Sequence, residues 1–68
     1  MQPYTVKIQP NSLYYHKKPG INQPVVGVVQ KNQVYTIVEE ALGLGSSKWG
    51  KLKSGAGWLP LDQCVRVR

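Results

Sequence analysis

Apolar and polar side chains alternate along much of the chain, which is the pattern of half-buried β-strands. Tyr4, Val6 and Ile8 alternate with Thr5 and Lys7 in the first such segment. Residues 13–16 form a short second run, and further strands are predicted at 25–29, 34–40 and 48–53, from residue 58 onward, and at 64–67. No segment keeps helical apolar spacing for the roughly ten to twelve residues that a helix needs. We therefore expect an all-β chain, a small antiparallel barrel of five to six short strands with little or no helix.

Glycine, proline and asparagine separate these segments. Residues 17–24 are rich in proline and glycine and are expected to form a long irregular loop. Residues 25–29 are rich in β-branched valine and fit a buried strand, in which Gly27 marks a place where a ring or another backbone comes close. Asn32 suits a left-handed backbone conformation in a turn. The remaining connections are expected to be a loop at 41–47, a tight hairpin at 54–57 and a single turn at 60–63.

The length of 68 residues allows one domain, residues 1–68, which removes only about 60% of its surface from water on folding. Hydrophobic residues make up 41% and charged residues 18%, a composition that favours a globular domain over a disordered tail. The aromatic residues are four Tyr and two Trp, whose polar atoms suit a partly hydrated binding surface. The net charge of +6 favours anionic partners, although the basic residues are scattered and are equally consistent with an ordinary solvated surface.

The residue inventory argues against an enzyme. One His and one Cys cannot supply the three or four ligands of a metal site, and no nucleophile and base are suitably spaced, so we expect no catalytic residue, metal or cofactor. Residues 43–48 lack the full pattern of a phosphate-binding loop and are expected to be flexible. Cys64 is expected to be a small buried apolar residue. Without an apolar run of about 18 residues, no membrane partner is expected, and no export signal is found in this segment.

The two tryptophans carry the strongest indication of function. Within residues 48–53, Trp49 and Lys51 fall on one face and Gly50 and Leu52 on the other, because side chains alternate along a strand. Leu52 is the core candidate, so Trp49 is expected to point outward. An exposed indole beside ammonium groups could hold a ligand with an apolar part and a carboxylate or phosphate. The alternative interpretation is that each tryptophan caps an open end of the barrel.

The segments "LYYHKKPG", "VVGVVQKNQVYTIVEE" and "WGKLKSGAGWL" together resemble the bacterial SH3-like (SH3b) domains of cell-wall hydrolases, phage lysins and other surface proteins. The resemblance runs from residue 13 to residue 65. The matching residues are Leu13, Pro19, Gly20, Val26, Gly27, Lys31, residues 37–40, Trp49, Lys51, Leu52, Gly55, Gly57 and Trp58. Tyr14, Tyr15 and His16 replace the family's usual Asn-Val-Arg, Asn32 replaces a turn glycine, and Cys64 replaces a common tyrosine.

The resemblance implies a non-catalytic module, excised from a larger protein, that holds its parent protein on peptidoglycan. The parent protein could itself be a cell-wall hydrolase. The expected ligand is a stem or cross-bridge peptide bound in an aromatic groove between loops, with anionic wall polymers as a further partner. The implied location is the outside or surface of a bacterial cell, and the implied state is a monomer.

The residues expected to bind this ligand are Tyr14, His16, Trp49, Lys51 and Trp58. Alternation places Leu13 and Tyr15 inward and Tyr14 and His16 outward, so the outward pair that departs from the family pattern changes the exposed surface. Lys51 is expected to add electrostatic attraction.

Three other functions remain open at this point. A small basic barrel could bind nucleic acid, but Arg66 and Arg68 are the only arginines and both lie at one end of the chain. A eukaryotic-type SH3 domain would need acidic residues between His16 and Pro24, where this chain has two lysines instead. The module could also be a structural spacer or a protein-interaction domain without affinity for the wall.

Overall fold

Seven β-strands form one antiparallel sheet in the computed structural model, which describes residues 2–68. The strands are β1 (Tyr4–Ile8), β2 (Ser12–His16), β3 (Val25–Gln30), β4 (Val34–Gly43), β5 (Ser46–Leu52), β6 (Trp58–Pro60) and β7 (Cys64–Arg66), and a 3-10 helix, η1 (Leu61–Gln63), precedes β7. Their order across the sheet is β3-β2-β6-β5-β4-β1-β7. Strands make up 58% of residues 2–68 and helix 4%, so the prediction of an all-β chain with little helix is confirmed.

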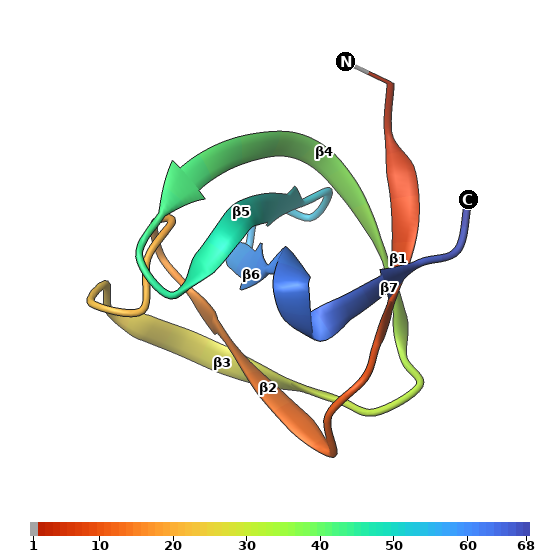
Figure 1. Cartoon of the computed structure of the whole chain (residues 1–68), viewed down its shortest axis with the longest axis horizontal. Helices are drawn as coiled ribbons and strands as arrows, with labels where there is room; N and C mark the ends of the chain where they lie inside the picture. The colour runs from red at the N-terminus through yellow and green to blue at the C-terminus, as the bar shows by residue number, and fades with distance from the viewer. Residues whose placement is uncertain (1) are drawn as a thin grey trace.

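The sheet is curved but does not close into a barrel. β4 runs as a long arc around one side of the molecule (Figure 1). β3 and β7 are the two edges of the sheet, and within residues 2–68 no ladder joins them. The number of strands is thus seven instead of five to six, and the closed barrel is not observed. The late strands are short, since β6 and β7 have three residues each and β6 meets β2 at the single pair Trp58–His16.

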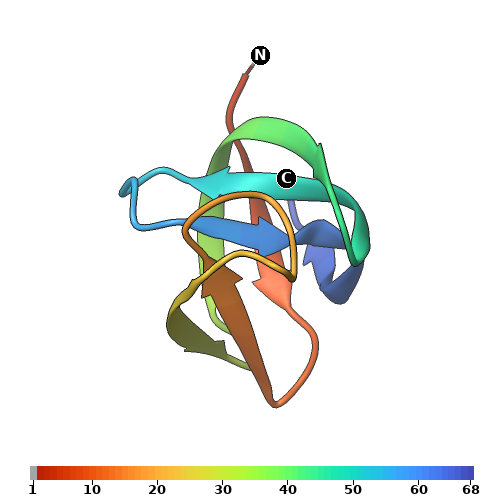
Figure 2. The same cartoon turned by 90° about the vertical axis from the view of Figure 1, so that its left-hand side faces the viewer.

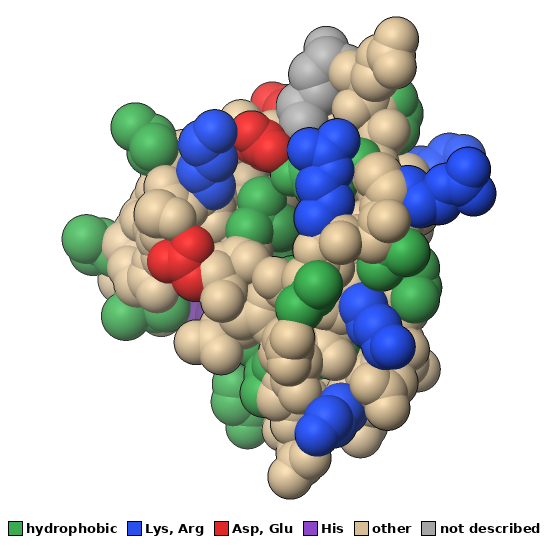
Figure 3. Space-filling model, turned by 45° about the vertical axis from the view of Figure 1, so that its right-hand side comes forward, with side chains coloured by type: hydrophobic (Ala, Val, Ile, Leu, Met, Phe, Trp, Pro, Cys, Tyr) green, Lys and Arg blue, Asp and Glu red, His purple; other side chains and the backbone are tan. Residues whose placement is uncertain are grey.

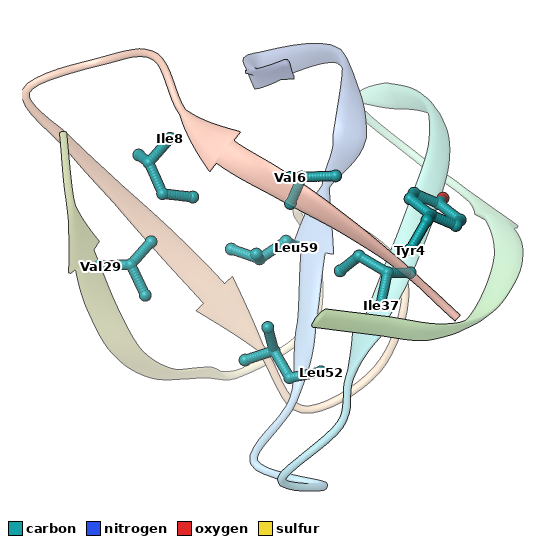
Figure 4. Packing of buried hydrophobic residues seen from close by; sticks show 7 residues of the cluster. All are labelled: Tyr4, Val6, Ile8, Val29, Ile37, Leu52 and Leu59. Atoms are coloured by element: carbon teal, nitrogen blue, oxygen red, sulfur yellow. The ribbon is translucent and has the colours of Figure 1, made fainter. Parts of the chain in front are cut away.

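The core lies on the concave side of the sheet, where alternate residues of the strands meet (Figure 4). Its buried members are Tyr4, Val6, Ile8, Val29, Ile37, Leu52 and Leu59. The inward alternation predicted for the first strand and for Leu52 is therefore confirmed. Each fully buried side chain of this size contributes about 1.5–3 kcal/mol of hydrophobic stabilisation. Strand β1 supplies three of these residues, and β3, β4, β5 and β6 supply one each, so the core is small, as expected for so short a chain.

Most predicted turns are confirmed, and one is wrong. Residues 17–24 form an irregular loop, Asn32 has a left-handed φ of 70°, and the chain turns between β5 and β6 with Gly55 at φ 79°. Residues 41–47 are not a loop, because β4 continues to Gly43 and β5 begins at Ser46. A two-residue turn, Leu44 and Gly45, joins these strands, and Gly45 adopts a positive φ of 88°, which glycine accommodates without a steric penalty.

The valine-rich strand β3 lies at the edge of the sheet, which corrects the prediction that it is buried. Val25 and Val28 are exposed, and Val29 is the valine of this strand that reaches the core. The expected close approach at Gly27 is confirmed, because a Cβ there would lie 2.5 Å from the Tyr15 hydroxyl oxygen. An edge strand has a neighbouring strand on one side only, so its apolar residues can remain exposed to solvent.

Tyr4 combines burial in the core with a polar contact between β1 and β4. Its hydroxyl donates a hydrogen bond to Glu40, whose other carboxylate oxygen lies 3.3 Å from Lys48 Nζ. The guanidinium of Arg66 stacks on the Tyr4 ring, 4.2 Å from the ring centroid. Burial, followed by the hydrogen bond to Glu40, raises the pKa of Tyr4 to about 12. The hydrogen bond from Tyr4 and the ammonium of Lys48 lower the pKa of Glu40.

Replacing Tyr4→Phe is expected to raise the pKa of Glu40 toward its ordinary range, because the phenolic donor is lost. In the wild type, the depressed pKa of Glu40 stabilises the fold above the unfolded-state pKa, and this contribution is lost as the pH falls through the lower folded-state pKa. NMR titration of the Glu40 carboxyl measures the shift, and urea unfolding across the acidic range measures the smaller pH dependence of the variant.

Tyr35→Phe is the matched control, because the Tyr35 hydroxyl donates to Gln33 Oε1 at 2.9 Å and has no carboxylate partner. A Glu40 pKa that responds equally to both substitutions would show that the Tyr4 hydrogen bond does not control it.

Candidate functional site

The sheet register places all five predicted ligand-binding residues on one face of the sheet. Trp58 of β6 lies opposite Lys51 of β5 on one side and opposite His16 of β2 on the other. Trp49 lies two residues before Lys51 on the same strand and meets the His16 ring edge-on, with 5.3 Å between ring centroids and 89° between ring planes. Tyr14 lies two residues before His16 on β2. These residues share the convex face of the sheet, the face opposite the core.

Trp49 lies on the predicted face but is fully buried, so the expectation that it is exposed is wrong. Its side chain is 0% exposed, and it is absent from the cluster of core residues on the concave side. The indole N–H donates a hydrogen bond to the Leu44 carbonyl at 3.2 Å. Alternation therefore assigned the face correctly, but a segment distant in sequence covers this part of the face.

The covering segment is the loop of residues 17–24, which folds back over the convex face (Figure 2). The backbone N–H of Ile21 donates to the Leu44 carbonyl at 3.1 Å, so this one carbonyl binds both the loop and the Trp49 indole. Gly43 permits the contact, because a Cβ there would lie 2.7 Å from the backbone carbon of Pro19. Without a side chain at this position, the loop reaches the turn between β4 and β5.

His16 is also buried, at 7% exposure, which corrects its predicted outward exposure. Its Nδ1 lies 2.8 Å from the carbonyl oxygen of Gln23 and must donate the hydrogen, because a carbonyl can only accept. The loop closes around this contact, with the Lys17 N–H bonded to the Pro24 carbonyl at 2.9 Å. His16 thus fixes the loop from below and is covered by it.

Three of the predicted residues remain accessible. Tyr14 is 61% exposed, Trp58 is half-buried, and the Lys51 side chain is 41% exposed. The Lys51 ammonium lies 3.9 Å from a carboxylate oxygen of Glu39. An exposed ion pair at this distance is a weak interaction. Val28 extends this surface, because it lies opposite Tyr14 in the register and is 46% exposed. The run of valines does not indicate that Val28 is accessible, because its exposure depends on the position of β3 at the edge of the sheet.

Trp49 and His16, two of the residues expected to line a groove between loops, are buried. Depressions of the surface occur elsewhere. One lies between Glu40, Leu42 and Lys48, one at the start of β1 beside Arg66 and Arg68, and one beside Lys7, Asn32 and Val65. The accessible side chains of Tyr14, Trp58 and Lys51 form an aromatic platform beside the covered indole of Trp49.

The remaining candidate chemical groups are held in structural roles. Burial raises the pKa of the Cys64 thiol to about 11, so the thiol stays protonated at neutral pH. Hydrogen bonds from Ser47 lower the pKa of Asp62 and tie η1 to β5, with Ser47 Oγ 2.5 Å from Asp62 Oδ1. Among residues 2–68, no group of three or more His, Cys, Asp or Glu side chains is placed to hold a metal ion. The same residues contain no helix long and apolar enough to span a membrane.

Comparison of the chain with protein-family models, with curated proteins and with solved structures found no match. The interpretation of the platform therefore depends on its own geometry and on the residues that carry the resemblance to SH3b domains.

Replacing Trp49→Ala is expected to lower the free energy of unfolding by about 3–5 kcal/mol, because it removes a fully buried ring and leaves a cavity. Urea denaturation followed by far-UV circular dichroism measures the change. Trp58→Ala is the matched control and should cost less, since Trp58 is only half-buried. Equal losses in the two variants would contradict the placement of Trp49 beneath the loop.

Proposed function

We propose that this chain is a non-catalytic bacterial SH3-like module that binds stem or cross-bridge peptides of peptidoglycan on the platform formed by Tyr14, Trp58 and Lys51. The module holds a larger parent protein on the wall, outside the bacterial cell. These three residues are the accessible members of the set of five that the sequence suggests as ligand-binding residues. Trp49 and His16 support it from below.

The observation that carries the proposal is the row in which Lys51, Trp58 and His16 lie side by side across three strands, with Tyr14 two residues from His16 along β2. Two partly accessible rings on one face offer apolar area together with polar atoms at their rims. A shallow surface of this kind fits a short extended peptide better than a compact small molecule, which needs a concave site. Lys51 adds a positive charge that suits a peptide with a free carboxylate.

The buried pair beneath the platform favours a preorganised site. The Trp49 indole is fixed by the Leu44 carbonyl, and the His16 ring packs edge-on against it. Trp58 lies opposite His16, so the position of β6 depends on this pair. Binding to a rigid surface loses less conformational entropy than binding to a mobile one. Trp49 and His16 are therefore positioning residues in this proposal.

The distribution of charge supports attraction to an acidic wall. The net charge is +6, and Lys and Arg side chains are spread over the face shown in Figure 3, with Asp and Glu confined to its upper and left parts. Such a field accelerates encounters with anionic polymers and weakens as salt increases. Anionic wall polymers are thus secondary partners, and the aromatic platform supplies the specific contacts.

The same arrangement makes nucleic acid a weaker candidate. Binding of single strands needs stacking rings and phosphate-binding cations along one groove. Arg66 and Arg68 belong to the β7 edge of the sheet, whereas Tyr14 lies on β2, beside the opposite edge. The stacking rings and the arginines therefore do not follow one track.

Trp58→Ala and Tyr14→Ala are each expected to weaken retention of the domain on purified Gram-positive sacculi by roughly tenfold, because each removes a ring from the platform. Pull-down at graded sacculus concentrations measures the affinity. Val65→Ala, on an exposed position of β7, should leave retention unchanged.

The same pull-down in a salt series, run beside a gel shift with mixed oligonucleotides, separates the possible functions. Retention on sacculi should survive moderate salt, whereas binding through phosphates alone should not. A folded domain that sacculi do not retain would contradict the proposed function and would leave a structural spacer. A salt-sensitive gel shift without retention would indicate nucleic acid.

A further inference from the structure

Strand β3 has a neighbour on only one side. It pairs with β2 and is the last strand in the order of the sheet. Natural proteins protect such edges with charged residues, prolines, bulges or short strands. The residues Val25 to Gln30 contain no charge and no proline, and a bulge interrupts the pairing only at the first part of the strand, between Tyr15 and His16 on the partner. The second half of β3 is therefore an unprotected edge.

The ladder between β2 and β3 identifies which backbone groups are free. The N–H of Lys31 donates to the Asn11 carbonyl at 3.2 Å, so Lys31 faces β2. In an antiparallel pair, residues that face the partner strand alternate with residues that face away. Val29 therefore faces β2 as Lys31 does, and the N–H and C=O of Val28 point to the open side.

Gln30 supports this assignment independently. Its backbone N–H donates to the side-chain oxygen of Gln33 at 2.8 Å, away from β2. A side chain thus occupies the open side at Gln30. Val28 is the next residue along the strand with the same orientation, and its side chain is 46% exposed.

The surroundings of Val28 suit an apolar, acidic peptide. Val26 is 49% exposed, and Tyr14, opposite Val28, is 61% exposed, so apolar side chains line the open edge. Exposed Lys31 follows the end of β3, and exposed Lys17 lies beside its start through the bond to Pro24. Positive charge at both ends of an uncharged strand attracts carboxylates and opposes pairing with a second copy, which carries the same charge of +6.

We propose that the open edge of β3 binds an extended peptide as an eighth strand, with main-chain hydrogen bonds to the N–H and C=O of Val28 and with carboxylates directed to Lys17 and Lys31. This inference rests on the proposed function, because it assigns the binding geometry of the same class of peptide. Strand addition supplies affinity through the main chain, while alternate side chains contact the valines and Tyr14.

The test uses the synthetic peptide Ala-Glu-Val-Glu-Val, capped at both ends, and follows its binding to the intact chain by NMR titration. Val28→Pro removes the outward N–H and leaves the bonds of Val29 to β2, so affinity is expected to fall at least tenfold. Val28→Ala keeps the N–H and is the matched control, with an expected loss of less than threefold. Methylating the backbone nitrogen of the central valine of the peptide should abolish binding to the unchanged chain.

Any one of three results with the peptide would overturn the proposal: wild-type chain that does not bind it, a folded Val28→Pro variant that binds it as tightly as Val28→Ala, or full binding of the methylated peptide. The methylated peptide decides the matter even if Val28→Pro fails to fold. Retention of the wild-type domain on sacculi is scored separately. Sacculus binding that persists in Val28→Pro and is lost in Trp58→Ala would reject the edge site and leave the proposed function intact.

Discussion

The carbonyl oxygen of Leu44 accepts a hydrogen bond from the Trp49 indole and another from the Ile21 backbone, and the convex side of the sheet depends on this junction. It joins the turn between β4 and β5, the buried ring and the loop of residues 17–24. The junction forms only because Gly43 leaves room for the Pro19 backbone. A small domain buries little surface on its concave side, so this second buried cluster is a substantial part of its stability.

The junction also defines which side chains a ligand can reach. Because Trp49 and His16 are covered, the rings that a ligand can contact are those of Tyr14 and Trp58 at the margin of the loop. These rings lie beside β2, and β2 lies beside the open edge of β3. An extended peptide placed along that edge would therefore run close to Tyr14. The aromatic platform and the open edge form one continuous region of the molecule, which is distant in the sheet from the arginines near β7.

The sequence predicted the strands well because their alternation is a local property. It placed Tyr4, Val6, Ile8 and Leu52 in the core, and it assigned Trp49 to the correct face. It failed where exposure depends on distant segments. Trp49 and His16 are covered by a loop, and the valines of β3 are exposed because no strand follows beside them.

The predicted loop at 41–47 failed for a different reason. Its two glycines and two exposed leucines do not show the alternation of a half-buried strand. The strand β4 nevertheless continues through this segment to a two-residue turn. The closed barrel also lay beyond local patterns, because closure depends on hydrogen bonds between strands that are distant in sequence.

The exchange of the two indole protons with solvent, followed by NMR with and without soluble fragments of digested sacculi, tests the central claim most directly. Slow exchange is expected for Trp49, whose indole N–H is hydrogen-bonded within a buried cluster, whereas Trp58 should exchange fast and shift when ligand is added, and this contrast is the expected result. Fast exchange at Trp49, together with a ligand-induced shift confined to that residue, would contradict it.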